Sequence, residues 1–335
     1  MAEEFPAIFG REHVADSWVV AVGGRPVSLI GVARYTMSID GVVVPSASIG
    51  AVCTHPDYRG RGLAGRALDA AIDDTRRRGD VIMPISGGRS LYTRRHAAPA
   101  GPYHRMRVPR QRLGRAMGRP FEDGDVSAVM ALHERRPVRY RWRAATFRLL
   151  QDVQLRFGST AWVHADAAGR LDAWAIVRSG GPMHADPHSA LLLDWAGRPD
   201  RVGPLAAAGM DSQGCASLEV GCAWHERELI DWAAPLAAEH EVSAGRGTLR
   251  LLHLPRLIEL FAERLAPLHP RVTDRRLEMT TRAGTIALSD PTAIHHLLFS
   301  QASHWPEHLG LPGDLGAQVL PMLPIGVPDY GIHYT

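Results

Sequence analysis

The sequence predicts a mixed α/β (α+β) protein, and three observations carry this prediction. Strand-like apolar patterns fill residues 17–54, with a hairpin signal at Asp40-Gly41 between them. Residues 46–64 have the pattern of a strand, a short loop and the start of a helix. Strand and helix patterns then continue to alternate as far as residue 300. Together these patterns indicate sheets flanked by helices.

Length and composition narrow the broad class. The chain has 335 residues, enough for two or three domains, with 45% apolar and 22% charged residues, as in soluble globular proteins. No apolar run is long enough to span a membrane. The first residues are acidic and lack the basic and apolar regions of a secretory signal. We therefore expect a cytoplasmic protein with no membrane partner.

Charge and cysteine content exclude two further classes. The net charge is only +3, and the basic residues are spread along the chain, so we expect no nucleic acid partner. Cys53, Cys215 and Cys222 fit neither a disulfide framework nor a zinc pattern. The adjacent pair His295-His296 cannot face one site on a helix, so no metal is expected.

An antiparallel meander is predicted at the amino-terminal end. Residues 17–22 form a first strand, residues 26–39 a second, and the chain returns from residue 42 into a strand over residues 46–54. Pro56 ends this last strand because it has no N–H to donate to a neighbouring strand. The meander thus leads directly into the loop that follows.

The loop after the meander has the features of an anion site. Arg59-Gly60-Arg61-Gly62 opens a helix whose apolar face begins at Leu63. The first N–H groups of a helix lack intrahelical partners, and the helix dipole is positive there. Two arginines add fixed charge. This arrangement suits a phosphate or a diphosphate.

The elements after the loop alternate. The helix is expected to end near Arg78, followed by a buried strand over residues 81–86, a short helix over residues 89–95 and a strand over residues 103–108.

The motif Val52–Ala64 resembles the acyl-CoA signature of the GNAT N-acetyltransferase superfamily. The core pattern of that family, Arg/Gln-x-x-Gly-x-Gly/Ala, is met by Arg59, Gly62 and Ala64. The resemblance implies a GNAT fold, whose mixed sheet is splayed so that the acyl thioester lies between two strands. Little chain precedes residue 17, so the usual first strand and first helix are expected to be absent or shortened.

Residues 111–245 repeat the same order of elements. They are predicted to contain helices from Asp125 and over residues 147–155, strands within 161–177 and at 190–195, a helix at 202–209 and a strand at 218–223. This order resembles a second, degenerate GNAT-like domain. Its loop, residues 196–200, lacks the Arg-x-x-Gly-x-Ala pattern, so we expect no CoA there.

The carboxy-terminal pattern differs again. A strand (248–254), a helix (255–265), two strands within 276–286 and a helix (290–300) are predicted. This small α+β segment resembles a sterol-carrier-like module. The expected domains are therefore 1–110 (GNAT), 111–245 (degenerate GNAT-like) and 246–335 (sterol-carrier-like). The combination resembles the Eis-type acetyltransferases.

The resemblance implies acetyl-CoA as co-substrate and assigns residues to it. Backbone N–H groups around Val52, Cys53 and Thr54 are expected to hold the thioester carbonyl and pantetheine. The diphosphate is expected over the loop and helix start, at Arg59, Gly60, Arg61, Gly62, Leu63 and Ala64.

Two catalytic residues follow from the same resemblance. Tyr92 matches the tyrosine that GNAT enzymes often use as general acid; the alternative is that it only packs beneath the cofactor. In Eis-type enzymes the acid lies five residues further on, where this chain has Ala97. Those enzymes use their terminal carboxylate as base, which here is Thr335; a frayed terminus is the alternative.

The expected function is acetyl transfer from acetyl-CoA to a primary amine of a small molecule or peptide, such as an aminoglycoside-like compound, a polyamine or a lysine side chain. The alternative is a catalytically silent CoA-binding regulatory or assembly protein, favoured by the short amino end and Ala97. A lipid carrier, suggested by the carboxy-terminal segment alone, ranks last. The resemblance to Eis-type proteins also implies a homo-oligomer.

Overall fold

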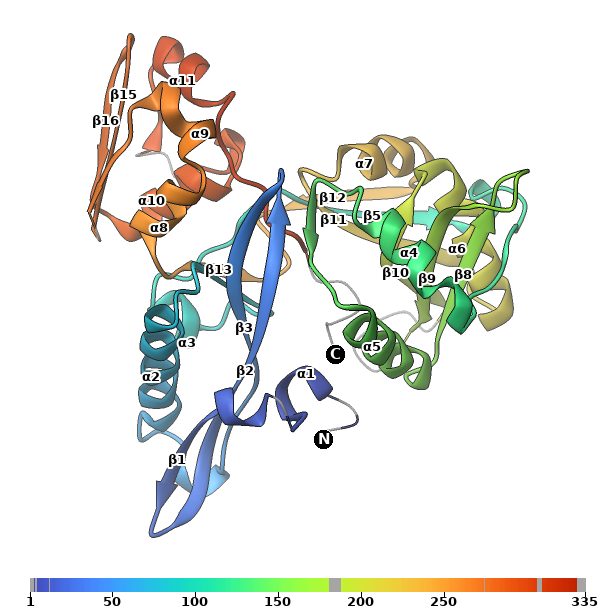
Figure 1. The fold of residues 1–335 in the computed structure, drawn as a ribbon, viewed down its shortest axis with the longest axis horizontal. Helices are drawn as coiled ribbons and strands as arrows, with labels where there is room; N and C mark the ends of the chain where they lie inside the picture. Colours follow the sequence, from blue (N-terminus) through green and yellow to red (C-terminus); the bar gives the residue numbers. More distant parts are fainter. Residues whose placement is uncertain are drawn as a thin grey trace. The chain divides into compact units, whose positions relative to one another are not determined.

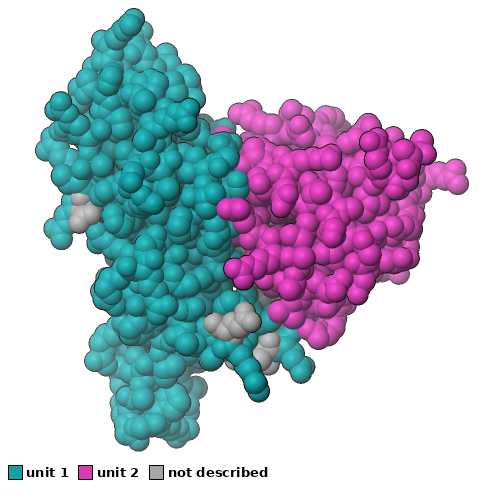
Figure 2. Space-filling model, viewed as in Figure 1, with its two compact units in different colours: residues 1–102, 244–327 teal, residues 103–243, 328–335 magenta. Residues whose placement is uncertain are grey.

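The computed structural model describes residues 3, 5–11, 13–180, 188–273, 275–305 and 309–329. The chain divides into two compact units, and each unit is assembled from two separate stretches of sequence (Figure 2). Unit 1 comprises residues 1–102 and 244–327, and unit 2 comprises residues 103–243 and 328–335. The chain therefore passes from one unit to the other three times.

Unit 1 contains a sheet with helices, followed by a smaller α+β part near the carboxyl end (Figure 1). Its elements are α1 (Pro6–Phe9), β1 (Trp18–Val22), β2 (Arg25–Ile39), β3 (Val42–Thr54), α2 (Leu63–Arg77), β4 (Ile82–Ile85), α3 (Ser90–Thr93), β13 (Thr248–Leu251), α8 (Leu254–Leu260), α9 (Ala262–Leu265), β14 (Arg271–Thr273), β15 (Arg276–Thr281), β16 (Gly284–Leu288), α10 (Pro291–Phe299) and α11 (Gly313–Val319).

The sheet of unit 1 runs in the order β1-β2-β3-β4-β13. Asp40 and Gly41 join β2 to β3, and both have positive φ (50° and 86°), as a tight hairpin turn requires. β4 runs parallel to β3 because α2 crosses over between them. The apolar face of α2, which includes Leu68 and Ala71, packs on the sheet against residues such as Ile30. This packing fixes where α2 begins.

The last strand of the unit 1 sheet comes from far along the chain. β13 pairs antiparallel with β4, with Thr248 opposite Ile85 and Leu251 opposite Ile82. The Thr248 hydroxyl also donates a hydrogen bond to the Gly87 carbonyl at 2.8 Å. Residues 1–102 alone therefore do not complete this sheet.

The carboxy-terminal part of unit 1 forms a three-stranded sheet, β14-β15-β16, with α8 to α11 (Figure 1, orange to red). Arg264 ties it to the larger sheet, since its guanidinium donates to the Asp40 carboxylate at 2.8 Å and to the Met322 and Pro324 carbonyls. The buried carboxy-terminal residues include Phe261, Leu277 and Phe299.

Unit 2 is built around the second large sheet. Its elements are β5 (Tyr103–Pro109), β6 (Arg119–Pro120), α4 (Val126–His133), β7 (Val138–Tyr140), α5 (Ala144–Arg156), β8 (Ser159–Ala165), β9 (Leu171–Ser179), β10 (Ser189–Gly197), α6 (Pro199–Gln213), β11 (Ser217–Ala223), α7 (Arg227–Ala233) and β12 (Glu239–Ser243). The sheet order is β12-β5-β11-β10-β9-β8-β6, with β10 and β11 parallel.

The predicted fold class is confirmed, and most predicted elements occur near their expected positions. Residues 103–108 do form a strand, but β5 lies between β11 and β12 in the second sheet instead of closing the first domain. The strand expected over residues 248–254 ends at Leu251, because the His253 side chain accepts a hydrogen bond from the Arg256 N–H and starts α8. α1, β6, β7, α7, β12, β14 and α11 were not predicted. The division into domains 1–110, 111–245 and 246–335 stays a prediction.

Candidate functional site

The site begins where two parallel strands of unit 1 separate. Ser46 pairs with Ile82 and Ile49 with Ile85, and the pairing of β3 with β4 ends there although β3 continues to Thr54. Ala51 lies just beyond this point and has a positive φ of 49°, which is uncommon for a residue with a side chain. The register of β2 with β3 shifts at the same place, so that two residues of β3 lie opposite one residue of β2. A bulge therefore accompanies the separation of the strands.

The amino-terminal helix packs on the bulge. A Cβ added at Gly31 or at Gly50 would lie 2.5 Å from a side-chain carbon of Ile8 in α1. Only glycine allows this close approach. The described residues before β1 thus form α1 and one 3₁₀ turn, Val14–Asp16, and α1 covers the strands where they change course.

The loop after β3 brings the start of α2 to the separated strands. Pro56–Tyr58 form a 3₁₀ turn, and Gly60 and Gly62 both adopt positive φ (74° and 71°). Gly62 is the N-cap of α2, and no side chain caps this helix end. The first backbone N–H groups of α2 are therefore available to a ligand. This is the geometry of an anion site.

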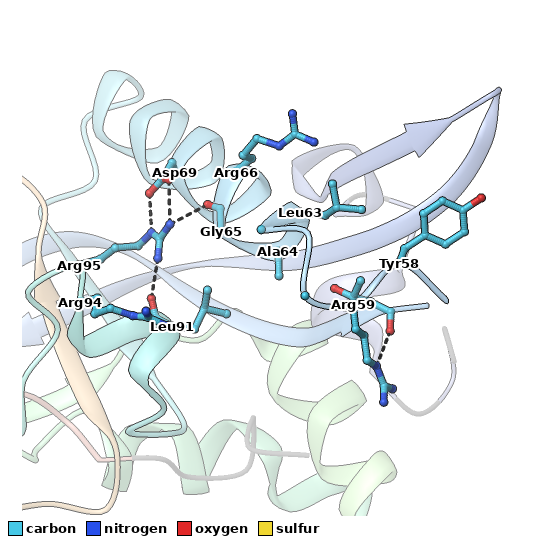
Figure 3. Close-up of a pocket in the computed structure, with 13 residues that line it drawn as sticks. Tyr58, Arg59, Leu63, Ala64, Gly65, Arg66, Asp69, Leu91, Arg94 and Arg95 are labelled. Atoms are coloured by element: carbon cyan, nitrogen blue, oxygen red, sulfur yellow. Dashed lines mark hydrogen bonds and ion pairs between the residues drawn. The ribbon is translucent and has the colours of Figure 1, made fainter. Parts of the chain in front are cut away.

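A cavity of about 710 Å³ lies over this loop (Figure 3). It is lined by residues from the end of β3, the loop, the first turns of α2, and α3 with the residues after it: Thr54, Tyr58, Arg59, Gly60, Gly62, Leu63, Ala64, Gly65, Arg66, Asp69, Leu91, Arg94 and Arg95. Its volume is in the range of small-molecule and cofactor sites.

One ion pair joins the two helices beside the cavity. The Arg95 guanidinium donates to both oxygens of the Asp69 carboxylate, and also to the Gly65 carbonyl at 3.0 Å and the Leu91 carbonyl at 2.9 Å (Figure 3). The hydrogen bond from Arg95 lowers the pKa of Asp69, and the same bond raises the pKa of Arg95. Arg95 thus holds the first turns of α2 against α3.

The other loop arginines are placed by backbone contacts. The Arg59 Nε donates to the Thr54 carbonyl at 3.2 Å, and Arg61 donates to the Asp57 carbonyl at 2.9 Å. The Arg61 guanidinium also lies 5.0 Å from the centre of the Tyr58 ring, within the range of a cation–π contact. Arg59 lines the cavity, whereas Arg61 stacks beside it.

Comparison with known proteins gives this geometry a context. The family described as acetyltransferase (GNAT) domain matches residues 2–95, the stretch that supplies β1 to β4, α2 and α3. This stretch therefore has the fold of a GNAT acetyltransferase domain. No curated protein matches the sequence.

Three solved structures share the fold over most of the chain. They are a GCN5-related N-acetyltransferase from Kribbella flavida (15% identity, TM-score 0.64, covering 95% of this chain and 90% of that one), a probable N-acyltransferase from Enterococcus faecalis (13%, 0.67, 98% and 96%) and Eis1 from Mycobacterium abscessus (16%, 0.52, 83% and 79%). At these identities the similarity concerns the fold alone.

The structure brings most of the predicted CoA residues to the cavity. Thr54, Arg59, Gly60, Gly62, Leu63 and Ala64 line it. Val52 and Cys53 lie in the part of β3 beyond its pairing with β4. Gly65, Arg66, Asp69, Arg94 and Arg95 also line the cavity, and the sequence motif did not indicate them. Helical spacing from the glycine motif could have suggested Arg66 and Asp69.

The Tyr92 side chain lies in the apolar core and does not line the cavity. Its side chain is 8% exposed and belongs to the apolar cluster beneath α2, while Leu91 and Arg94 line the cavity. A Cβ at Gly87, just after β4, would lie 3.7 Å from the Tyr92 ring. Burial raises the pKa of Tyr92, which Arg89 partly opposes, so the phenol stays protonated at neutral pH. Ala97 is also buried.

The second predicted catalytic residue, Thr335, lies outside the described residues. The nearest described part of the tail, Pro328 and Asp329, belongs to unit 2 and lines a small cavity there.

The corresponding strands of unit 2 also separate, but an ion network fills the space. β10 pairs with β11 only from Ser189 to Leu191 and then diverges. The Arg136 guanidinium donates to Asp194 at 2.9 Å and to Glu226 at 2.6 Å. The cavity lined by these residues measures about 30 Å³, the volume of about one water molecule.

Among the described residues, no group of three or more His, Cys, Asp or Glu side chains is arranged to hold a metal ion. The described helices include none that is both long and apolar enough to cross a membrane.

Proposed function

We propose that the protein is an acetyl-CoA-dependent N-acetyltransferase that acetylates a primary amine of a small molecule or peptide by direct transfer. The observation that carries the proposal is the uncapped start of α2, which meets a 710 Å³ cavity at the point where β3 leaves β4. A GNAT domain match over the same residues supports it.

The separated strand and the loop have distinct parts in this proposal. Backbone N–H groups of Val52, Cys53 and Thr54 would hold pantetheine and polarise the thioester carbonyl, because β4 no longer occupies them. The glycine loop and helix start, Arg59 to Ala64, would bind the diphosphate. Glycine at positions 60 and 62 lets the backbone approach the phosphates closely.

Acetyl transfer also needs proton transfers. The amine must lose a proton before it attacks the carbonyl carbon, and the departing CoA thiolate must gain one. We assign the second step to the Tyr92 hydroxyl, which its burial keeps protonated. The first step is assigned to the terminal carboxylate of Thr335, directly or through water.

The wider architecture belongs to the same proposal. By resemblance, we propose a tandem, Eis-like arrangement with a second GNAT-like domain and a sterol-carrier-like carboxy-terminal domain. We also propose, on the same ground, a cytoplasmic location and assembly into a homo-oligomer. The amine could be carried by an aminoglycoside-like compound, a polyamine or a lysine side chain.

Thiol release from acetyl-CoA with a diverse panel of amines tests the proposal. We expect turnover by the wild type, and a loss of about 100-fold or more in kcat for Tyr92→Phe with little change in acetyl-CoA affinity. Removal of the last three residues should have a similar effect. Thr93→Val, on the same short helix, serves as the control. Binding of acetyl-CoA without turnover of any amine would contradict the catalytic proposal.

A catalytically silent CoA-binding protein is the second candidate. It is favoured by the position of Tyr92, which is buried among apolar side chains and does not line the cavity. In that case Tyr92→Phe would leave ligand binding intact, and no amine would accelerate thiol release.

A further inference from the structure

Unit 2 contains a cavity that the proposed function does not use. It has a volume of about 280 Å³ and is lined by residues of α4 and its C-cap, of β7 with the two residues after it, and of α5. The cavity at the glycine loop shares none of these residues. A volume just below the usual range for drug-sized ligands suits a ligand with a single ring.

Part of the lining is aromatic and firmly packed. The rings of Tyr140 and Trp142 stack, with their centres 5.3 Å apart and their planes 23° from parallel. The buried Phe147 ring packs against Trp174, with the ring centres 5.6 Å apart. Aromatic rings that their neighbours hold in place offer a preformed surface to a flat, apolar group.

The charged residues of the lining favour an anion. They are two arginines, Arg139 and Arg141, and one carboxylate, Glu134. Burial lowers the pKa of His133 to about 4, so this fourth polar residue is neutral at pH 7. Two positive charges against one negative charge leave the lining with a net charge of +1, which disfavours an amine.

Arg139 has hydrogen-bond donors available for such an anion. Its Nη1 donates to the Arg136 carbonyl at 2.7 Å, whereas its Nε and Nη2 have no partner within the described part of the chain. Burial lowers the pKa of Arg139, and Glu134 opposes this effect. The nearby Arg141 and Arg136 lower it further. A partly desolvated guanidinium with an open edge binds a carboxylate through two parallel hydrogen bonds.

We propose that this cavity binds a small carboxylate with a flat, apolar body, such as an aryl carboxylate. The carboxylate accepts hydrogen bonds from Arg139, and the ring packs against the aromatic lining. Arg136 cannot take this role because its guanidinium is paired with Asp194 and Glu226. One guanidinium beside apolar rings suits the single charge of a carboxylate better than a phosphate monoester, which carries about −1.5 to −2. This site does not depend on acetyl transfer, so either proposal can fail alone.

Calorimetric titration of the full chain with four matched ligands tests the proposal. Phenylacetate, phenylacetamide and phenethylamine have nearly the same shape but are anionic, neutral and cationic at pH 7, and acetate has the charge without the ring. The test variant is Arg139→Gln. Arg135→Gln is one control, because Arg135 is exposed and does not line the cavity. Arg94→Gln is the other, because Arg94 lines the glycine-loop cavity instead.

We expect the wild type to bind phenylacetate with a Kd below about 1 mM, and at least about tenfold more tightly than the other three ligands. Arg139→Gln should bind phenylacetate at least about tenfold more weakly, because the charge-assisted hydrogen bonds are lost. Both controls should stay within about twofold of the wild type.

Four results would overturn the site. They are no binding of phenylacetate by the wild type, equally tight binding of any of the other three ligands, unchanged phenylacetate affinity in Arg139→Gln, and loss of phenylacetate binding in Arg94→Gln. The last result would place the ligand in the glycine-loop cavity. The comparison of the four ligands uses the wild type alone, so it decides the ligand class even if Arg139→Gln does not fold.

Discussion

At the residue scale, the site depends on backbone conformations that most side chains disfavour. Gly60 and Gly62 supply the positive φ that the loop needs, and glycine adopts it without steric cost. Ala51 adopts a similar φ of 49° in the bulge of β3, although its Cβ disfavours it by about 1–2 kcal/mol. The strand that contains Ala51 ends at Thr54, which lines the cavity, and strained backbone of this kind is often found near functional sites.

Substitution of Ala51 should reveal this strain. Ala51→Val should lower the free energy of unfolding by about 1–2 kcal/mol, because a β-branched side chain tolerates the left-handed region poorly. Ala51→Gly should leave stability within about 0.5 kcal/mol of wild type, since relief of strain offsets the greater freedom of the unfolded chain. Urea unfolding measures both. A valine variant as stable as wild type would show that this position is extended in solution.

At the element scale, the Arg95–Asp69 pair holds α3 against the start of α2. Local sequence signals predicted both helices but not this contact, because nothing in the pattern pairs residues 26 positions apart. The same holds for Ala51: alanine gives no local sign of positive φ, whereas the glycines and the Asp40-Gly41 turn do. The loop could therefore be predicted from the sequence, and the bulge that separates the strands could not.

The Arg95–Asp69 pair should make stability depend on pH. The pKa of Asp69 is lowered in the folded chain, so its contribution is present above the ordinary carboxyl pKa and is lost as the pH falls through the folded value. Asp69→Asn should therefore cost about 0.5 kcal/mol at pH 7, and the difference from wild type should shrink below about pH 4. Glu263→Gln, at an exposed carboxylate on α9, is the control. A difference that does not change with pH would contradict this role.

At the scale of the whole molecule, each sheet is completed by a strand from a distant stretch. β13 closes the first sheet beside β4, and β5 lies between β11 and β12 in the second. Strand propensity indicates that a segment is extended but carries no information about its partner. That is why the sequence pattern predicted these strands but assigned β5 to the wrong sheet.

The positions of β13 and β5 predict how fragments of the chain will fold. A fragment of residues 1–110 lacks β13 and keeps β5 without its partners, so we expect it to aggregate or stay unfolded. Residues 1–102 joined by a short Gly/Ser linker to residues 244–327 should fold cooperatively. The two ends meet, because a Cβ at Gly101 would lie 2.2 Å from the Ala244 carbonyl oxygen. Circular dichroism and thermal unfolding compare the two. A monodisperse, cooperatively unfolding 1–110 fragment would contradict this description.

We propose that one acyl-CoA binds per chain, at the glycine loop of unit 1. The loop is open there, whereas Arg136, Asp194 and Glu226 fill the corresponding separation in unit 2. Calorimetric titration of acetyl-CoA tests it most directly. We predict a stoichiometry of one per chain and an affinity at least about tenfold weaker in Gly62→Val, whose side chain cannot adopt the φ of 71° without strain. No binding, binding of two molecules per chain, or unchanged affinity in Gly62→Val would show that the glycine loop is not the single acyl-CoA site.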